Sequence, residues 1–211
     1  MNLAVLSREE IFADVKRTHH IIFQTTGPAP TGFISPAWGS SRALYDVLNE
    51  LEYRYDTSAF PSWIMIPVML KNALNYFGNQ KMYRIFHRKD FISFLWGRRQ
   101  VYKEGDVTVL PLPTNRYHVA CWHTLGFVIG WERHLQLLRS CLRDVDAFYY
   151  LIHPADLMDM SDLNPIKKLP FEPRGPSLEE RQKRLKEAIE VILESGREIV
   201  TMRELAVRNA P

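Results

Sequence analysis

Residues 31–61 constrain the fold of this chain more than any other stretch, because they place a helical pattern between two strand-like runs. Residues 32–35 form a short apolar run that Pro36 closes, and residues 53–56 form the second run. Between the runs, Ser40 or Ser41 can cap a helix whose apolar face contains Leu44, Val47, Leu48 and Leu51. A strand, a helix and a strand at this spacing predict a βαβ unit, whose parallel strands end on the same rim.

That rim is where α/β folds place their binding and catalytic residues. The sequence brings four side chains with functional potential to the two strand ends: Pro36, Trp38, Asp56 and Ser58. We therefore expect them to lie together. Asp56 has a simpler alternative role, since it can form an Asx turn with Thr57 or Ser58, and both roles can coexist.

The remaining chain repeats the alternation of strand and helix. A capping box at Ser7 and Glu10 starts a helix that Gly27 ends, with a buried stripe of Ile11, Phe12, Val15, Ile22 and Phe23. Later segments predict strands at 106–112, 147–152 and 198–202, and helices at 125–142, from Ser177 to Gly196, and at 203–207. The helix after Ser177 should bury Leu178, Leu185, Ile189 and Ile192. This order predicts an α/β fold with mostly parallel strands.

Residues 61–105 interrupt that pattern as a helical, aromatic-rich insertion. Its first half is an apolar helix-like run broken by Pro67, and residues 81–104 carry seven Lys or Arg against two acidic residues among several aromatic ones. Basic groups among aromatic residues suit contact with a membrane surface through 61–104. The alternative is an insertion packed on the domain with a solvated basic rim. No nucleic-acid-binding motif accompanies it, so we expect no nucleic acid partner.

Composition indicates one ordinary globular domain over residues 1–211. Hydrophobic residues make up 46% and charged residues 24%, and the formal net charge is only +3. Cys121 and Cys141 have no metal-site spacing, so we expect reduced, buried thiols. The sequence contains neither a signal peptide pattern nor an apolar run of membrane-spanning length. The expected location is the cytoplasm or the cytoplasmic face of a membrane.

Four segments of the chain resemble motifs of one enzyme family. The segments FISPAW (33–38) and YDTSAFP (55–61) are similar to the third and fourth motifs of the polysaccharide deacetylase (NodB-homology, carbohydrate esterase) family. LIHP (151–154) is similar to its fifth motif, and EIVTMRELA (198–206) to its last strand and helix. The resemblance implies a partial or distorted (β/α) barrel. It also implies hydrolysis of N- or O-acyl groups on sugars with a divalent metal such as zinc.

The resemblance assigns roles to individual residues. His153 would donate a proton to the leaving amine, and Asp56 would hold its imidazole in one tautomer. Trp38 and Leu151 would form the wall of a pocket for the acyl methyl group, with Pro36 and Ser58 also in the substrate site. The alternative for His153 is a histidine that anchors a loop before a proline.

Other parts of the family pattern are missing. No TFDD-like or HSxxH-like metal-binding motif occurs, and Ile34 stands where the family usually has an Arg that orients the base. His19 and His20 are adjacent in a predicted helix and point about 100° apart, which is poor geometry for one metal. We therefore expect no metal or other cofactor in this chain alone. A domain without the N-terminal metal-binding strands should also leave a sheet edge open, which a companion chain or a second copy would cover.

These features lead to three functional hypotheses. The first is a deacylase of a glycan or lipid-linked sugar of the cell envelope, inactive alone or a fragment of a longer enzyme. The second is a non-catalytic remnant that binds a glycan or a protein, with an association with the membrane surface. The third is a membrane-surface adaptor that acts through residues 61–104.

Overall fold

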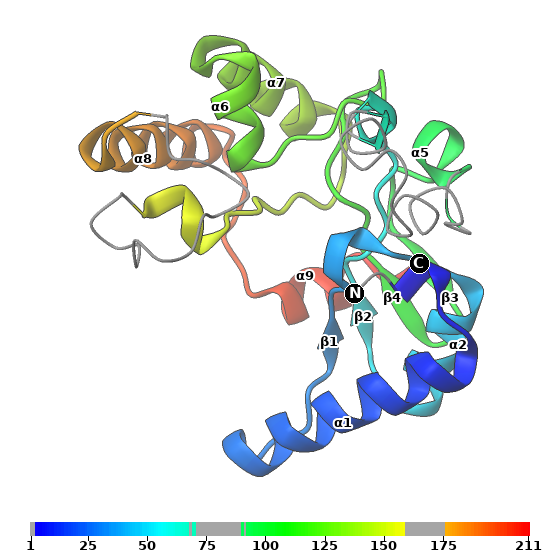
Figure 1. Cartoon of the computed structure of the whole chain (residues 1–211). Coiled ribbons are helices and arrows are strands. Elements are labelled where there is room, and N and C mark those ends of the chain that lie inside the picture. The colour runs from blue at the N-terminus through cyan, green and yellow to red at the C-terminus, as the bar shows by residue number, and fades with distance from the viewer. Residues whose placement is uncertain (1–2, 68, 71–89, 91, 159–175) are drawn as a thin grey trace.

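The computed structural model describes residues 3–67, 69, 70, 90, 92–158 and 176–211, and shows a mixed α/β fold (Figure 1). Its sheet has four strands in the order β1-β2-β4-β3, and the sheet is open rather than closed into a barrel. Strands β1, β2 and β4 are parallel, whereas β3 runs antiparallel to β4. Along the chain the elements are η1 (Leu3–Val5), α1 (Arg8–Thr26), β1 (Gly32–Phe33), η2 (Pro36–Trp38), α2 (Arg42–Glu50), β2 (Tyr55–Asp56), α5 (Ser93–Trp96), β3 (Tyr102–Glu104), β4 (Val107–Val109), η3 (His123–Leu125), α6 (Gly126–Ile129), α7 (Trp131–Asp144), η4 (Pro154–Leu157), α8 (Leu178–Glu194) and α9 (Met202–Arg208).

The predicted βαβ unit is confirmed as β1, α2 and β2. The Ser41 hydroxyl caps α2 by accepting a hydrogen bond from the Leu44 amide. The apolar face of α2 is buried through Leu44, Val47 and Leu48. Both strands are shorter than the apolar runs that predicted them, because pairing stops where the chain turns toward η2 and toward Ser58.

The first helix begins with the predicted capping box, in which Ser7 and Glu10 exchange hydrogen bonds. Gly27 ends it with a φ of +87°, a conformation that glycine adopts without strain. Only part of the predicted stripe is buried. Ile22 and Phe23 are exposed, because α1 runs past the sheet, as Figure 1 shows.

Part of the predicted insertion belongs to the sheet. Strand β3 pairs with β4 across a turn at Gly105, whose φ is +64°. Strand β4 lies within the predicted strand 106–112 and is covered by α1 and α2 through Val107 and Val109. Of the apolar helix predicted after Pro61, residues 65–67 are helical, whereas residues 68 and 71–77 lie outside the described residues. Of the basic aromatic segment, residues 81–89 and 91 lie outside them.

The second half of the chain is helical. The helix predicted at 125–142 is instead η3, α6 and α7, because Gly130 adopts a φ of +91° and breaks the helix. Helix α8 forms as predicted, but it buries Arg181, Ala188 and Val191, and Ile189 is 41% exposed. Of the predicted stripe, Ile192 packs against the cluster that α8 shares with α7, but Ala188 and Val191 are the residues of that cluster that α8 buries.

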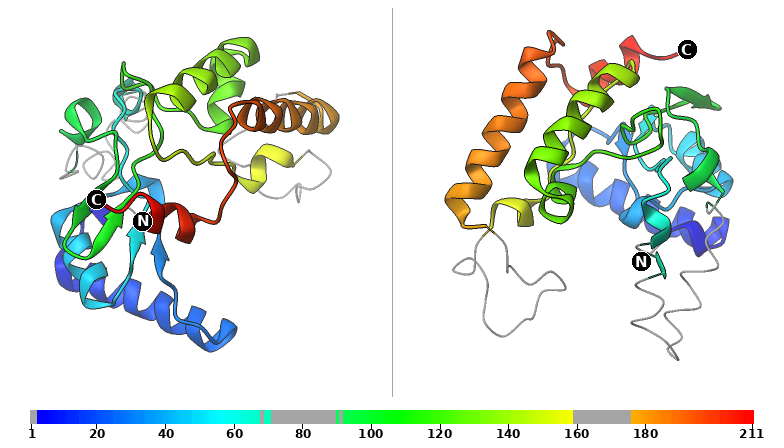
Figure 2. Two further views of the ribbon diagram at one scale, coloured as in Figure 1. Left: turned by 180° about the vertical axis from the view of Figure 1, so that it is seen from behind. Right: turned by 90° about the horizontal axis from the view of Figure 1, so that it is seen from above.

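Two predicted strands were wrong. Residues 147–152 and 198–201 lack regular strand pairing; the first segment connects α7 to η4, and the second connects α8 to α9 (Figure 2). Apolar β-branched and aromatic residues favour extended backbone, but a strand also needs a neighbouring strand to pair with. The last helix is confirmed as α9, which Thr201 caps together with Glu204.

Four apolar clusters form the interior of the described part of the chain. One joins α1 and α2 to the sheet, and a second joins α7 to α8. The third, called the middle cluster, contains Phe60 and Phe94, with Trp38, Trp122 and Leu151 packed against it. The fourth joins α9 to the sheet through Leu110, Ala147 and Ala206. Cys121 and Cys141 are free and buried, as predicted. The candidate site lies around the middle cluster.

Candidate active site

The ends of β1 and β2 are joined by a buried hydrogen bond. The Ser35 amide, two residues after Phe33, donates to the Ser58 hydroxyl over 2.8 Å. The Ser35 hydroxyl donates to the Gly39 carbonyl over 2.7 Å, and so holds the turn between β1 and α2. The parallel strand ends therefore meet on one rim.

Asp56 is completely buried at that rim. One of its oxygens accepts from the Ser58 hydroxyl over 2.5 Å, and the other accepts from the Ser58 amide over 2.9 Å. The second bond forms the Asx turn that the sequence allowed. Burial raises the Asp56 pKa from 3.8 to about 6, against the hydrogen bonds from Ser58 that favour the carboxylate.

The strand register shows which face of the sheet Asp56 occupies. Asp56 pairs directly with Phe33 on β1 and with Val109 on β4. Directly paired residues lie on the same face, and Phe33 and Val109 belong to the core that α1 and α2 cover. Asp56 therefore lies between the sheet and these helices. Tyr45 of α2 is close enough to influence its ionisation.

Trp38 lies at the end of η2, two residues after Pro36. Ala37 and Trp38 both have positive φ, at 54° and 49°, so this turn is strained for residues with a side chain. The Trp38 ring packs 4.9 Å from Phe60 and 6.2 Å from Trp122, measured between ring centroids. These contacts fix the indole over the middle cluster.

His153 follows the extended segment 147–152 and is partly exposed, with 46% of its side chain accessible. Its ring meets that of Trp38 edge to face, with 6.3 Å between the centroids. Its Nδ1 atom lies 3.1 Å from the Thr124 hydroxyl, and that hydroxyl also contacts the Asp156 carboxylate. The imidazole is therefore held from one side and accessible to water on the other.

Leu151 precedes His153 by two residues and packs on the same cluster as Trp38. Its carbonyl accepts a hydrogen bond from the His123 amide over 3.0 Å, which ties the segment to η3. The structure thus brings Pro36, Trp38, Leu151 and His153 to one place.

Asp56 and Ser58 are connected to this group through the hydrogen bond from the Ser35 amide to the Ser58 hydroxyl, since Ser35 directly precedes η2. The hydrogen bonds of Asp56 go to Ser58, and those of the His153 ring go to Thr124. The contact between Asp56 and the His153 ring that the resemblance implies is therefore absent from the described hydrogen bonds, and the ring contacts Thr124 instead.

Thr124 and Asp156 were missed by the sequence analysis. Asp156 had a local signal, because it stands three residues after His153, the spacing of a capping box, and its carboxylate accepts the His153 amide over 2.8 Å. Thr124 had no such signal, because it is 29 residues away and comes close only through the fold.

A second polar network is buried nearby, between α7 and the extended segment. The Tyr150 hydroxyl lies 2.9 Å from His123 Nδ1 and 2.8 Å from His134 Nε2. Both histidines are fully buried, and desolvation lowers the pKa of each, that of His134 to about 4. Tyr150 has one proton, so it donates to one ring and accepts from the other, and the network is uncharged. Because it is closed to water, we interpret it as structural.

The described side chains do not fit a metal site. Among them, no group of three or more His, Cys, Asp or Glu is arranged to hold a metal ion. His20 is exposed, whereas His19 packs on Tyr53, so these neighbours do not converge. No chemical step is therefore assigned to a metal held by these residues.

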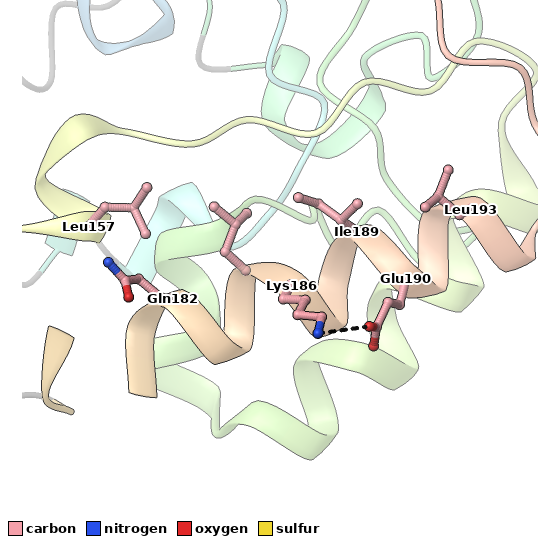
Figure 3. A pocket seen from close by; sticks show the side chains of 7 residues that line it. Leu157, Gln182, Lys186, Ile189, Glu190 and Leu193 are labelled. Atoms are coloured by element: carbon pink, nitrogen blue, oxygen red, sulfur yellow. Dashed lines mark ion pairs between the residues drawn. The ribbon is translucent and has the colours of Figure 1, made fainter. Parts of the chain in front are cut away.

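A shallow apolar groove of about 410 Å³ lies between η4 and α8 (Figure 3). Leu157 forms one side and α8 the other, and the Lys186–Glu190 ion pair runs along its rim. The other lining residues are Gln182, Leu185, Ile189 and Leu193. The groove lies next to His153 along the chain, because His153 caps the start of η4 and Leu157 is the last residue of η4.

The fold defines a mixed α/β protein with a small, mostly parallel, open sheet. Comparison with protein-family models, with curated proteins and with solved structures finds no match. Over the described part of the chain, no helix is both long and apolar enough to cross a membrane.

Proposed function

We propose that this chain carries the acyl-binding and proton-donating side of a carbohydrate deacylase site. The observation that carries the proposal is the contact between the Trp38 and His153 rings, because Trp38 packs on the middle cluster together with Leu151. An indole and an aliphatic side chain next to a water-accessible imidazole suit an acyl methyl group and the amide beside it. The resemblance to polysaccharide deacetylases, with its partial (β/α) barrel, supports the same assignment.

In this proposal His153 acts on the leaving group. Its imidazolium donates the Nε2 proton to the sugar nitrogen as the bond from that nitrogen to the acyl carbon breaks, and the ring becomes neutral. Trp38 and Leu151 exclude water from the methyl side of the acyl group.

A titration with N-acetylated chitooligosaccharides tests the proposal. We expect binding to the full chain by calorimetry, weakened about tenfold or more by Trp38→Ala, since stacking on an aromatic ring dominates such contacts. Trp96→Ala is the matched control, because Trp96 lies on α5 and is 75% exposed. No binding, or an equal loss in both variants, would contradict the proposal.

Acetate release separates the enzyme from a binding protein. Zinc-dependent release that His153→Gln removes would support the deacylase. Binding without zinc and without release would support the second candidate, a non-catalytic glycan- or protein-binding remnant. The apolar groove beside η4 favours that candidate as a protein-binding surface, because its walls are aliphatic rather than aromatic.

The outer edge of β1 suggests that two copies of this chain associate through it. β1 pairs only with β2 in the described sheet, and Ile34 beside it is exposed. A second copy pairing at this edge predicts a concentration-dependent dimer in analytical ultracentrifugation. Ile34→Lys should abolish that dimer, and a monomer at all concentrations would exclude it.

A further inference from the structure

The Thr124 hydroxyl lies at the centre of three polar atoms. Its oxygen is 3.1 Å from His153 Nδ1, 2.9 Å from Asp156 Oδ1 and 3.1 Å from Asp156 Oδ2. His153 Nδ1 itself is 3.7 Å from the carboxylate, too far for a direct hydrogen bond. Thr124 is therefore the link between the imidazole and the carboxylate.

The number of protons fixes the direction of each bond. A hydroxyl has one proton, and an ionised carboxylate can only accept. The Thr124 proton must therefore go to Asp156, and the Thr124 oxygen can only accept from His153. It follows that His153 carries a proton on Nδ1 in both its neutral and its charged form.

Asp156 is well placed to hold this arrangement. It is 3% exposed, its carboxylate accepts the His153 amide over 2.8 Å, and its own amide donates to the His153 carbonyl over 2.9 Å. The carboxylate is therefore tied to the backbone of the residue whose side chain it helps to orient. Both contacts lie within η4 and its cap, so the geometry is local and short-range.

We propose that Thr124 and Asp156 are the positioning residues of His153, and that they keep Nδ1 protonated so that Nε2 alone exchanges protons at the site. The proposal deepens the proposed function and rests on it. It assigns to Asp156, through Thr124, the positioning role that sequence resemblance gives to Asp56. When the imidazolium gives its Nε2 proton to the leaving nitrogen, the Nδ1 proton stays bound to Nδ1 and hydrogen-bonded to the Thr124 oxygen, and the lone pair remains on Nε2.

The tautomer of His153 can be measured directly, without substrate. Long-range proton–nitrogen NMR correlations distinguish the two ring nitrogens, and His153→Gln identifies the His153 signals among those of the seven histidines. In wild type at high pH we expect the Nδ1–H form to dominate. A dominant Nε2–H form would overturn the proposal.

Three variants test the roles of the two residues. Thr124→Val removes the acceptor while keeping the shape, so Nε2–H should become the main form, and Thr124→Ser should restore Nδ1–H. In Asp156→Asn the remaining oxygen must still accept the His153 amide, which turns the amide nitrogen toward Thr124. That nitrogen would donate to the hydroxyl, the hydroxyl would donate to His153 Nδ1, and the tautomer should invert.

The readouts separate this proposal from the proposed function. An unchanged tautomer in both Thr124→Val and Asp156→Asn, with native backbone NMR spectra, would refute the positioning roles even if the chain deacetylates sugars. If the tautomer responds as expected but no sugar is bound, only the deacylase proposal fails. Where turnover is observed, Thr124→Val should lower it about tenfold or more, and Thr124→Ser should recover it.

Discussion

Replacing Asp56 with Asn should change how the stability of the protein depends on pH. The wild-type carboxyl is completely buried, and burial raises its pKa from 3.8 to about 6. The folded state therefore binds this proton more tightly than the unfolded state. Wild-type stability falls as the pH rises from about 4 to about 6, because over that interval the unfolded state releases this proton while the folded state still holds it.

The size of the effect follows from the two pKa values. A change from 3.8 to about 6 corresponds to about 3 kcal/mol in the free energy of unfolding. Asn has no proton to lose, so the variant escapes this cost. The free energy of unfolding of Asp56→Asn minus that of wild type should therefore rise by about 2–2.5 kcal/mol from pH 4 to pH 7, since the unfolded carboxyl is already partly ionised at pH 4.

The difference between the two proteins is the quantity to measure. His134 acts in the opposite direction, because burial lowers its pKa from 6.5 to about 4, so its contribution to stability is lost as the pH falls through this range. In wild type the two contributions oppose each other. Both proteins contain His134, so its effect cancels in the difference.

Urea titrations followed by tryptophan fluorescence at pH 4, 5, 6 and 7 give the required free energies. Asp46→Asn controls for the change in net charge, since Asp46 is on the exposed face of α2. Ser58→Ala should steepen the pH dependence, because it removes a hydrogen bond that favours the Asp56 carboxylate. A difference between Asp56→Asn and wild type that stays constant within about 0.5 kcal/mol from pH 4 to pH 7 would refute the reasoning.

His134→Phe should lose about 2 kcal/mol less stability than wild type between pH 7 and pH 5, because it removes the buried imidazole with the lowered pKa; equal losses in urea titrations would contradict this. Gly32→Ala should lower the free energy of unfolding by about 1–3 kcal/mol, since its Cβ would lie 2.1 Å from the Tyr55 ring; unchanged stability would mean that the ring moves aside. Cys121 and Cys141 should react with a thiol reagent only after unfolding in urea, and immediate reaction of the native protein would disprove their burial.

The sequence predicted the local features well where neighbouring residues determine them. The capping box at Ser7 and the hydroxyl of Ser41 set the starts of α1 and α2, and both signals lie within four residues of the backbone groups they satisfy. The βαβ unit followed because its short connections leave little choice of arrangement. The partners of the extended segment 147–152 could not be read in the same way, since strand pairing depends on distant parts of the chain.

The candidate site shows the same division. Trp38 and His153 were predicted from separate motifs and meet in the structure, whereas Thr124 was missed because only tertiary packing brings it to His153. Asp56 was predicted correctly at the strand end, but the residue pairing of β1, β2 and β4 was needed to show that it faces α1 and α2. A one-residue difference in register would have turned it to the opposite face.

The position of the site follows from how the two main cores meet. Trp38 lies in the connection between β1 and α2, Trp122 directly precedes η3, and both rings pack on Phe60. His153 contacts Trp38 on one side and Thr124 of the helical half on the other. Its environment therefore depends on both halves being in place, and a shift between them would change the contact with Trp38 while leaving the short-range contact with Asp156 intact. The proposed substrate binding at Trp38 and the proposed tautomer of His153 can therefore be tested separately, because the first depends on contacts between the two halves and the second on contacts within the helical half.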